Sequence, residues 1–157
     1  KSTGEAIGYD KKMTRALYKA LQASGMQVVN YGTLLVTVAD KDKEEALPLI
    51  QRFYNMGFNI EATHGTALFL KEHGVRTRIR QKISDGNEEI LEAMRQGYVT
   101  YVINTRDYGS TGVLSDGHEI RQCAVENGVT MFTALDTVKV LLDVLEEVTM
   151  GISTINA

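Results

Sequence analysis

Apolar residues along the chain form short runs that alternate with stretches of helical spacing. Residues 34–39 are continuously apolar apart from one threonine, as in a strand buried on both faces. Residues 75–80 alternate between arginine and other residues, which is typical of an edge strand with one wet face. The pattern predicts strands over residues 34–39, 58–62, 75–80, 98–103 and 129–133. It predicts helices over residues 10–24, 44–56, 66–73, 88–96, 115–127 and 136–147.

Strands that alternate with helices at these spacings predict an α/β fold. We expect a Rossmann-like, three-layer α/β/α arrangement with a five-stranded, mainly parallel sheet. Asp10 is a candidate N-cap for the first helix, and Pro48 should loosen or bend the first turns of the second. Residues 1–9 are expected to be a linker, residues 10–147 the domain, and residues 148–157 a tail without a pattern. A chain that begins without Met is expected to be a piece of a longer protein.

Composition narrows the classes of function. The chain has 157 residues, 43% of them hydrophobic, which suits one compact domain with a substantial core. Its net charge is −3 and no Lys/Arg stripe offsets its twenty acidic residues, which argues against a nucleic-acid binder. No apolar run is long enough to cross a membrane, so no membrane partner is expected. The lone Cys123 has no disulfide partner, which fits a cytoplasmic location.

The stretch 59–67 has the pattern of an anion-binding cradle. A short strand runs into Thr63-His64-Gly65-Thr66, and a helix follows. The first N–H groups of a helix lack intrahelical partners and carry partial positive charge, so they favour a phosphate or a carboxylate. Two threonines add hydroxyl donors, and Gly65 leaves the backbone open. Alternatively, Thr63 or Thr66 simply caps the helix.

Other candidates follow from the rule that ligands of such sheets bind outside the carboxyl ends of the strands. The rule selects the loops 40–43, 63–66 and 82–86, and Asn104-Thr105 after the fourth strand. Lys43 and Lys82 could supply positive charge. The alternative for each lysine is a solvated surface charge, and Asn104 could merely satisfy the backbone where its strand ends.

Several stretches resemble the methylglyoxal-synthase-like domain, specifically the regulatory domain that ends the large subunit of carbamoyl-phosphate synthase. The resemblance covers the core 36–143. Residues 1–8 also look like the segment that closes the second ATP-using module of that subunit. The stretches that carry the resemblance within the core are TVADKDKEEA at 37–46, GFNIEATHGTA at 57–67, YVINT at 101–105, SDGHEIR at 115–121 and TALDT at 133–137.

The resemblance implies that the intact protein makes carbamoyl phosphate for pyrimidine and arginine synthesis, using ATP with Mg or Mn. Its partners would be the preceding ATP-grasp modules and a small glutaminase subunit. This piece would be a non-catalytic regulator without a cofactor of its own, which binds a phosphorylated nucleotide of the UMP or IMP class. The implied effector-binding residues are Lys43, Thr63, Gly65, Thr66, Lys82, Asn104, Thr105 and, at the ribose hydroxyls, Asp116. Residues 106–111 depart from the family pattern, which leaves the effector open.

Two other functions remain open. Methylglyoxal synthases share the fold and the Thr-x-x-Thr turn, and they remove a proton and expel phosphate, which needs a carboxylate base and a polarising group. In that family a Gly-Gly-Asp supplies the base. Here residues 85–88 read Asp-Gly-Asn-Glu, the family's histidine position is apolar, and only Asp116 matches a catalytic carboxylate. The third possibility is a self-association module without a ligand.

The histidines and the cysteine favour no further chemistry. His64 has no acidic partner nearby in sequence, His73 ends a helix, and His118 opens another. No two histidines share a metal-ligand spacing, so we expect no metal site. Cys123 lies among apolar residues of a predicted helix and is expected to be a small core residue rather than a nucleophile.

Overall fold

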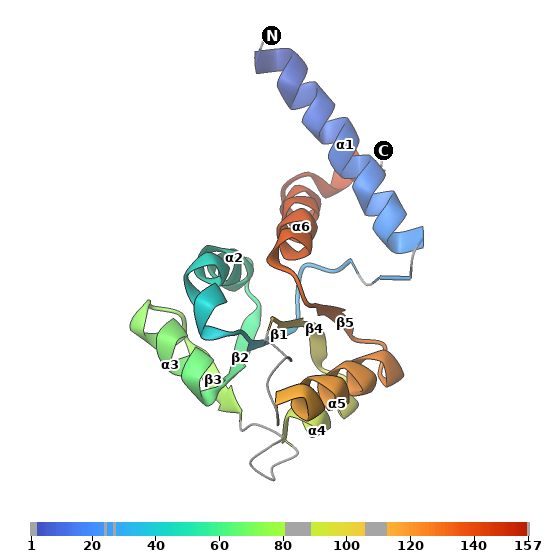
Figure 1. Cartoon of the computed structure of the whole chain (residues 1–157). Helices are drawn as coiled ribbons and strands as arrows, with labels where there is room; N and C mark the ends of the chain where they lie inside the picture. Colours follow the sequence, from blue (N-terminus) through green and yellow to red (C-terminus); the bar gives the residue numbers. More distant parts are fainter. Residues whose placement is uncertain (1–2, 24, 27, 81–88, 106–112, 157) are drawn as a thin grey trace.

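The computed structural model describes residues 3–23, 25–26, 28–80, 89–105 and 113–156, and it has the expected three-layer arrangement (Figure 1). The strands are β1 (Thr33–Thr37), β2 (Asn59–Thr63), β3 (Thr77–Arg80), β4 (Val99–Asn104) and β5 (Thr130–Phe132). The helices are α1 (Thr3–Ala23), η1 (Asp40–Asp42), α2 (Lys43–Asn55), α3 (His64–Glu72), α4 (Glu89–Arg95), α5 (Val113–Glu126) and α6 (Leu135–Asn156).

The five strands form one parallel sheet in the order β3-β2-β1-β4-β5. β1 is central, as its continuous apolar run predicted. Its alternate residues serve two cores: Leu34 and Val36 pack with α2, α3 and α6, whereas Leu35 packs with α4 and α5. β3 lies at the edge of the sheet, which confirms the interpretation of its alternating arginines.

Both ends of the chain differ from the expectation. The first helix begins at Thr3, so residues 3–9 are helical and Asp10 lies inside α1 rather than at its N-cap. Gly4 and Gly8 lower helix propensity by about 1 kcal/mol each relative to Ala, but they do not end a helix as proline would. The last helix continues to Asn156 instead of ending near residue 147. α6 contacts α1, and within the extension Thr149 Oγ1 accepts a hydrogen bond from Asn30 Nδ2 at 3.0 Å.

Pro48 lies in the sixth position of α2, which nevertheless runs unbroken from Lys43 to Asn55. Proline has no N–H to donate to the carbonyl four residues earlier, so the helix lacks one hydrogen bond there. The inward residues of α2 include Ala46, Ile50 and Phe53, all fully or almost fully buried. Their burial holds the helix on the sheet and thereby fixes its first residue, Lys43, at the carboxyl end of β1.

Candidate functional site

The order of the strands identifies the edge of the sheet where a ligand is expected. The chain proceeds outward from β1 to β2 and β3, then returns to the other side of β1 for β4 and β5. The direction of winding therefore reverses between β1 and β4. In open α/β sheets, ligands bind outside the carboxyl ends of the strands next to such a reversal. Thr37, Thr63 and Asn104 end the three neighbouring strands there.

The start of α3 has the features of an anion site. Thr63 is the N-cap residue, but its side chain makes no capping hydrogen bond. Instead, Thr63 Oγ1 donates to Thr37 Oγ1 at 3.4 Å, and Thr66 Oγ1 accepts the Val38 N–H at 3.5 Å. Both threonine side chains are therefore held against the end of β1. The alternative that Thr63 caps the helix through its side chain is therefore wrong.

Lys43 comes to the same place from α2. Its Nζ lies 3.7 Å from the position that a Cβ atom would have at Gly65. The Lys43 side chain is only 18% exposed, and its Nζ pairs with Asp40 Oδ1 at 2.7 Å. It is therefore not the solvated surface charge of the alternative interpretation. Gly65 does not have a positive φ, so the backbone does not require glycine there. What glycine provides is open space beneath the ammonium group.

Thr105 joins the ends of β1 and β4. Its N–H donates to the Thr37 carbonyl at 3.2 Å, and its Oγ1 accepts the Ala39 N–H at 3.2 Å. Asn104 lies opposite Thr37 in the register and is fully buried. Both residues therefore help to hold the carboxyl ends of β1 and β4 together. A direct contact between either residue and a ligand stays a prediction.

A polar cavity of about 310 Å³ opens beside Thr105. Its lining includes Asp42 of η1, Glu45 of α2, Thr133 after β5 and Asp136 in the first turn of α6. Asp42 belongs to the loop 40–43 that the sequence analysis selected, whereas Glu45, Thr133 and Asp136 were not predicted as site residues. The signal was present, because Thr133 follows β5 and the rule of strand carboxyl ends applies to it as well.

For two of the predicted effector-binding residues, Lys82 and Asp116, the structure describes no side-chain position. Lys82 lies outside the described residues, as do the stretches 85–88 and 106–112. Asp116 lies near the start of α5, and its side chain is outside the described part of the molecule. Their roles stay predictions.

The histidines and the cysteine occupy ordinary structural positions. His64 is exposed at the first turn of α3, and His73 follows α3 with Nδ1 2.8 Å from the Phe69 carbonyl. His118 is exposed within α5 and does not open it. Cys123 is buried in the core between α4 and α5, where burial raises the pKa of its thiol, so the prediction of a core residue is confirmed.

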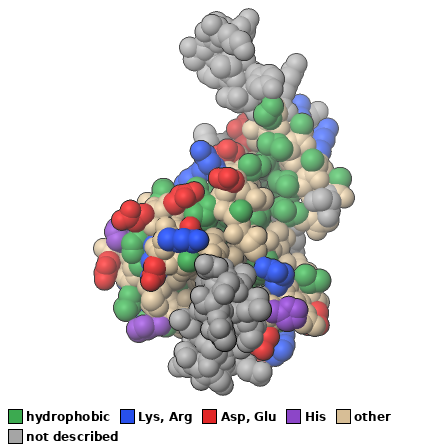
Figure 2. All heavy atoms as spheres, in the orientation of Figure 1, with side chains coloured by type: hydrophobic (Ala, Val, Ile, Leu, Met, Phe, Trp, Pro, Cys, Tyr) green, Lys and Arg blue, Asp and Glu red, His purple; other side chains and the backbone are tan. Residues whose placement is uncertain are grey.

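Charge around the site is mixed. Acidic side chains gather at the left of the space-filling view, over α2 and α3, with a few basic ones among them (Figure 2). Attraction of an anion must therefore come from local groups such as Lys43 and the start of α3. Within the described ranges, no group of three or more His, Cys, Asp or Glu side chains is arranged to hold a metal ion. The described helices include none with the length and apolarity needed to span a membrane.

Comparison with known proteins gives two results. The model of one protein family, the MGS-like domain, matches residues 45–133, which is more than half of the chain and includes Thr63, Gly65 and Thr66. The fold is also similar to the crystal structure of methylglyoxal synthase from Elizabethkingia anophelis NUHP1, with a TM-score of 0.60. The two sequences are 16% identical, and the match covers 73% of this chain and 79% of that one. At this identity the likeness concerns the fold.

Proposed function

Since the chain belongs to the MGS-like domain family, we propose that it is a regulatory domain that binds a phosphorylated small molecule without transforming it. The observation that carries the proposal is the position of Lys43 Nζ over Gly65, at the uncapped start of α3. A phosphate there accepts hydrogen bonds from backbone N–H groups, a charge-assisted bond from the ammonium group and further bonds from threonine hydroxyls. These donors converge from two helices, so the site is built by the fold.

The protein context is part of the proposal. We propose that the chain is the C-terminal regulatory domain of a carbamoyl-phosphate synthase large subunit, and that its ligand is a nucleotide of the UMP or IMP class. The preceding ATP-grasp modules and the small glutaminase subunit are its proposed partners, and ATP with Mg or Mn serves the modules rather than this domain. A ligand shifts the equilibrium between two states only through different affinities for them. Occupancy of the cradle would therefore change how the domain packs against the modules.

A second function is a phosphate-eliminating lyase of the methylglyoxal synthase type. The likeness to a methylglyoxal synthase fold favours it, together with the carboxylate of Asp40 beside Lys43. A general base must reach the substrate proton in its ionised form. In this structure Asp40 pairs with the same lysine that would hold the phosphate, at 2.7 Å, so it would have to exchange that partner for the substrate. Binding without turnover makes no such demand.

Calorimetry with UMP, IMP and phosphoribosyl pyrophosphate tests the binding function. We expect at least one of them to bind the wild-type chain, and we expect Lys43→Gln to weaken that affinity by at least about tenfold. Thr63→Ala with Thr66→Ala should weaken it as well. The matched control is Lys71→Gln, which removes an exposed lysine from the last turn of α3 and should leave the affinity unchanged.

The same proteins discriminate the other functions. Equal affinity of the wild type and Lys43→Gln would remove the cradle assignment. Steady release of methylglyoxal from dihydroxyacetone phosphate above the uncatalysed rate would establish the lyase instead. A stable oligomer that binds none of the nucleotides would favour the self-association module.

A further inference from the structure

A second cavity, of about 530 Å³, lies at the opposite end of the sheet from the cradle. It opens where β1, β2 and β3 begin, and its volume is within the range of roughly 300–1,000 Å³ that small-molecule sites occupy. Its lining includes Thr33, Tyr54, Asn59, Glu61, Arg76 and Arg78. Neither our sequence reasoning nor the proposed function assigns it a role.

The one acidic side chain in this lining is already neutralised. Glu61 is 4% exposed, and its Oε1 accepts a hydrogen bond from Arg80 Nε at 2.8 Å and another from the Tyr98 hydroxyl at 3.3 Å. Arg80 also donates to the Tyr98 hydroxyl, at 2.6 Å. A buried carboxylate is held in this way because an unpaired charge would be costly there. Glu61 therefore contributes little negative charge to the cavity.

The two arginines in the lining, unlike Glu61, have no oppositely charged partner among the described residues. Arg76 and Arg78 are exposed, and they alternate with the buried Thr77, so both extend from the same side of the edge strand. Within the described part of the chain, neither guanidinium forms an ion pair or a hydrogen bond. This differs from Arg52 and Arg80, each of which pairs with a carboxylate. Among the described residues, the two positive charges on this wall of the cavity thus have no carboxylate partner.

We propose that this cavity is a binding site for a small oxyanion, a carboxylate or a phosphate. A guanidinium group presents paired N–H donors that match the two oxygens of such a group, and two guanidiniums suit a ligand with more than one negative charge. Tyr54, 37% exposed, provides an aromatic wall for the body of the ligand. Charged residues on an edge strand also discourage strand pairing between molecules. Protection of an edge strand would not require a cavity beside the arginines. The presence of the cavity therefore favours a binding site.

The test is an amide NMR titration of the chain with inorganic phosphate and, separately, with citrate, at constant ionic strength adjusted with chloride. We expect saturable shifts at the amides of Asn59, Thr77 and Arg78 with at least one of the two anions, and which anion binds identifies the chemistry. Arg76→Gln with Arg78→Gln should raise the dissociation constant measured at these amides by about tenfold or more. Lys71→Gln with Arg95→Gln removes two positive charges elsewhere and should leave it unchanged.

The titration separates this site from the cradle. Lys43→Gln should abolish the shifts at Gly65 and Thr66 and preserve those at Asn59 and Thr77, so either site can fail without the other. The proposal is overturned if neither anion gives saturable shifts at the second cavity, or if the double arginine variant binds as the wild type does. It is also overturned if sedimentation velocity shows that the shifts follow self-association. Arg76→Gln alone provides the same comparison should the double variant not fold.

Discussion

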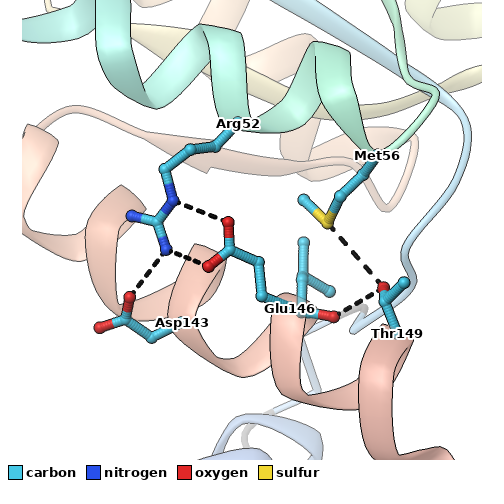
Figure 3. A network of polar contacts seen from close by, with 6 residues as sticks. Arg52, Met56, Asp143, Glu146 and Thr149 are labelled. Carbon is cyan, nitrogen blue, oxygen red and sulfur yellow. Dashed lines mark hydrogen bonds and ion pairs between the residues drawn. The ribbon is translucent and has the colours of Figure 1, made fainter.

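Arg52 on α2 holds Glu146 on α6 with two hydrogen bonds, from Nε at 2.9 Å and from Nη2 at 2.6 Å (Figure 3). The same Nη2 donates to Asp143 at 2.8 Å. The bond to Glu146 is the main reason that the pKa of the guanidinium is raised, and it lowers the pKa of the Glu146 carboxyl. The two helices joined in this way each begin at the carboxyl edge of the sheet, α2 with Lys43 and α6 beside Asp136. The cluster therefore joins the two helices whose first turns lie at the candidate site.

Replacement of Arg52 by Gln should lower the free energy of unfolding by about 1 kcal/mol, because the group is partly exposed but pairs in a two-pronged geometry with two carboxylates. Urea unfolding followed by circular dichroism measures the change. The control is Arg95→Gln, which breaks a single pair with Glu92 at 3.8 Å between two half-exposed side chains of α4 and should cost less than about 0.5 kcal/mol. Equal costs in the two variants would contradict a special role for the cluster.

The lowered pKa of Glu146 predicts a pH dependence of stability. A carboxyl whose pKa is lower in the folded state than in the unfolded state stabilises the fold when both states are ionised, above its usual value of 4.5. That contribution is lost as the pH falls through the folded-state pKa. We therefore expect the difference in unfolding free energy between the wild type and Glu146→Gln to shrink between pH 6 and pH 3. Urea unfolding at several pH values measures it, and a constant difference would argue against the pairing.

How far the sequence predicts this structure depends on the range of the interactions involved. The apolar run of β1 and the alternation of β3 are local signals, and they identify a central strand and an edge strand. The rule of strand ends brings Lys43, Thr63 and Gly65 to one place, because the ends of neighbouring parallel strands must meet. The contact between α1 and α6 joins helices that lie far apart in sequence, and no local pattern reveals it.

Contacts between distant segments also determine the parts of the two sites that the sequence does not predict. The bonds of Thr37 to Thr63 and Thr105 depend on three strands in exact register, and a single stretch of sequence contains no trace of them. The cavity at Arg76 and Arg78 depends on which arginines find a carboxylate. Arg80 reaches Glu61 and its neighbours do not, although the three arginines have the same spacing along the strand.

Tyr101 ties the segment before β1 to the core, and its removal should be costly. Its hydroxyl accepts the Val29 N–H at 3.0 Å and donates to the Val29 carbonyl at 3.1 Å, while burial raises its pKa to about 12. Tyr101→Phe leaves both backbone groups of Val29 without these partners, so we expect a loss of about 1–3 kcal/mol in unfolding free energy. Urea unfolding measures it. Tyr31→Phe is the control. Because Tyr31 is 67% exposed, this variant should have almost the same free energy of unfolding as the wild type.

Gly65 offers a test of the cradle that leaves the fold intact. Its backbone has no positive φ, and the described atom within 4 Å of an added Cβ is Lys43 Nζ, at 3.7 Å, which is ordinary contact. Gly65→Ala should therefore fold with equal or slightly greater stability, by up to about 1 kcal/mol, because alanine favours a helix. The new methyl group would occupy the space between the ammonium group and the helix start.

We expect this methyl group to weaken the binding of a phosphorylated ligand at the cradle by at least about tenfold, since the phosphate could no longer approach the backbone N–H groups. Calorimetry measures the affinity and a thermal melt confirms the fold. The control is Gly74→Ala, whose site follows α3 with a φ of +82°, so it should lower stability and leave affinity unchanged. If Gly65→Ala bound the ligand as tightly as the wild type, the ligand would have to lie elsewhere than between Lys43 and α3.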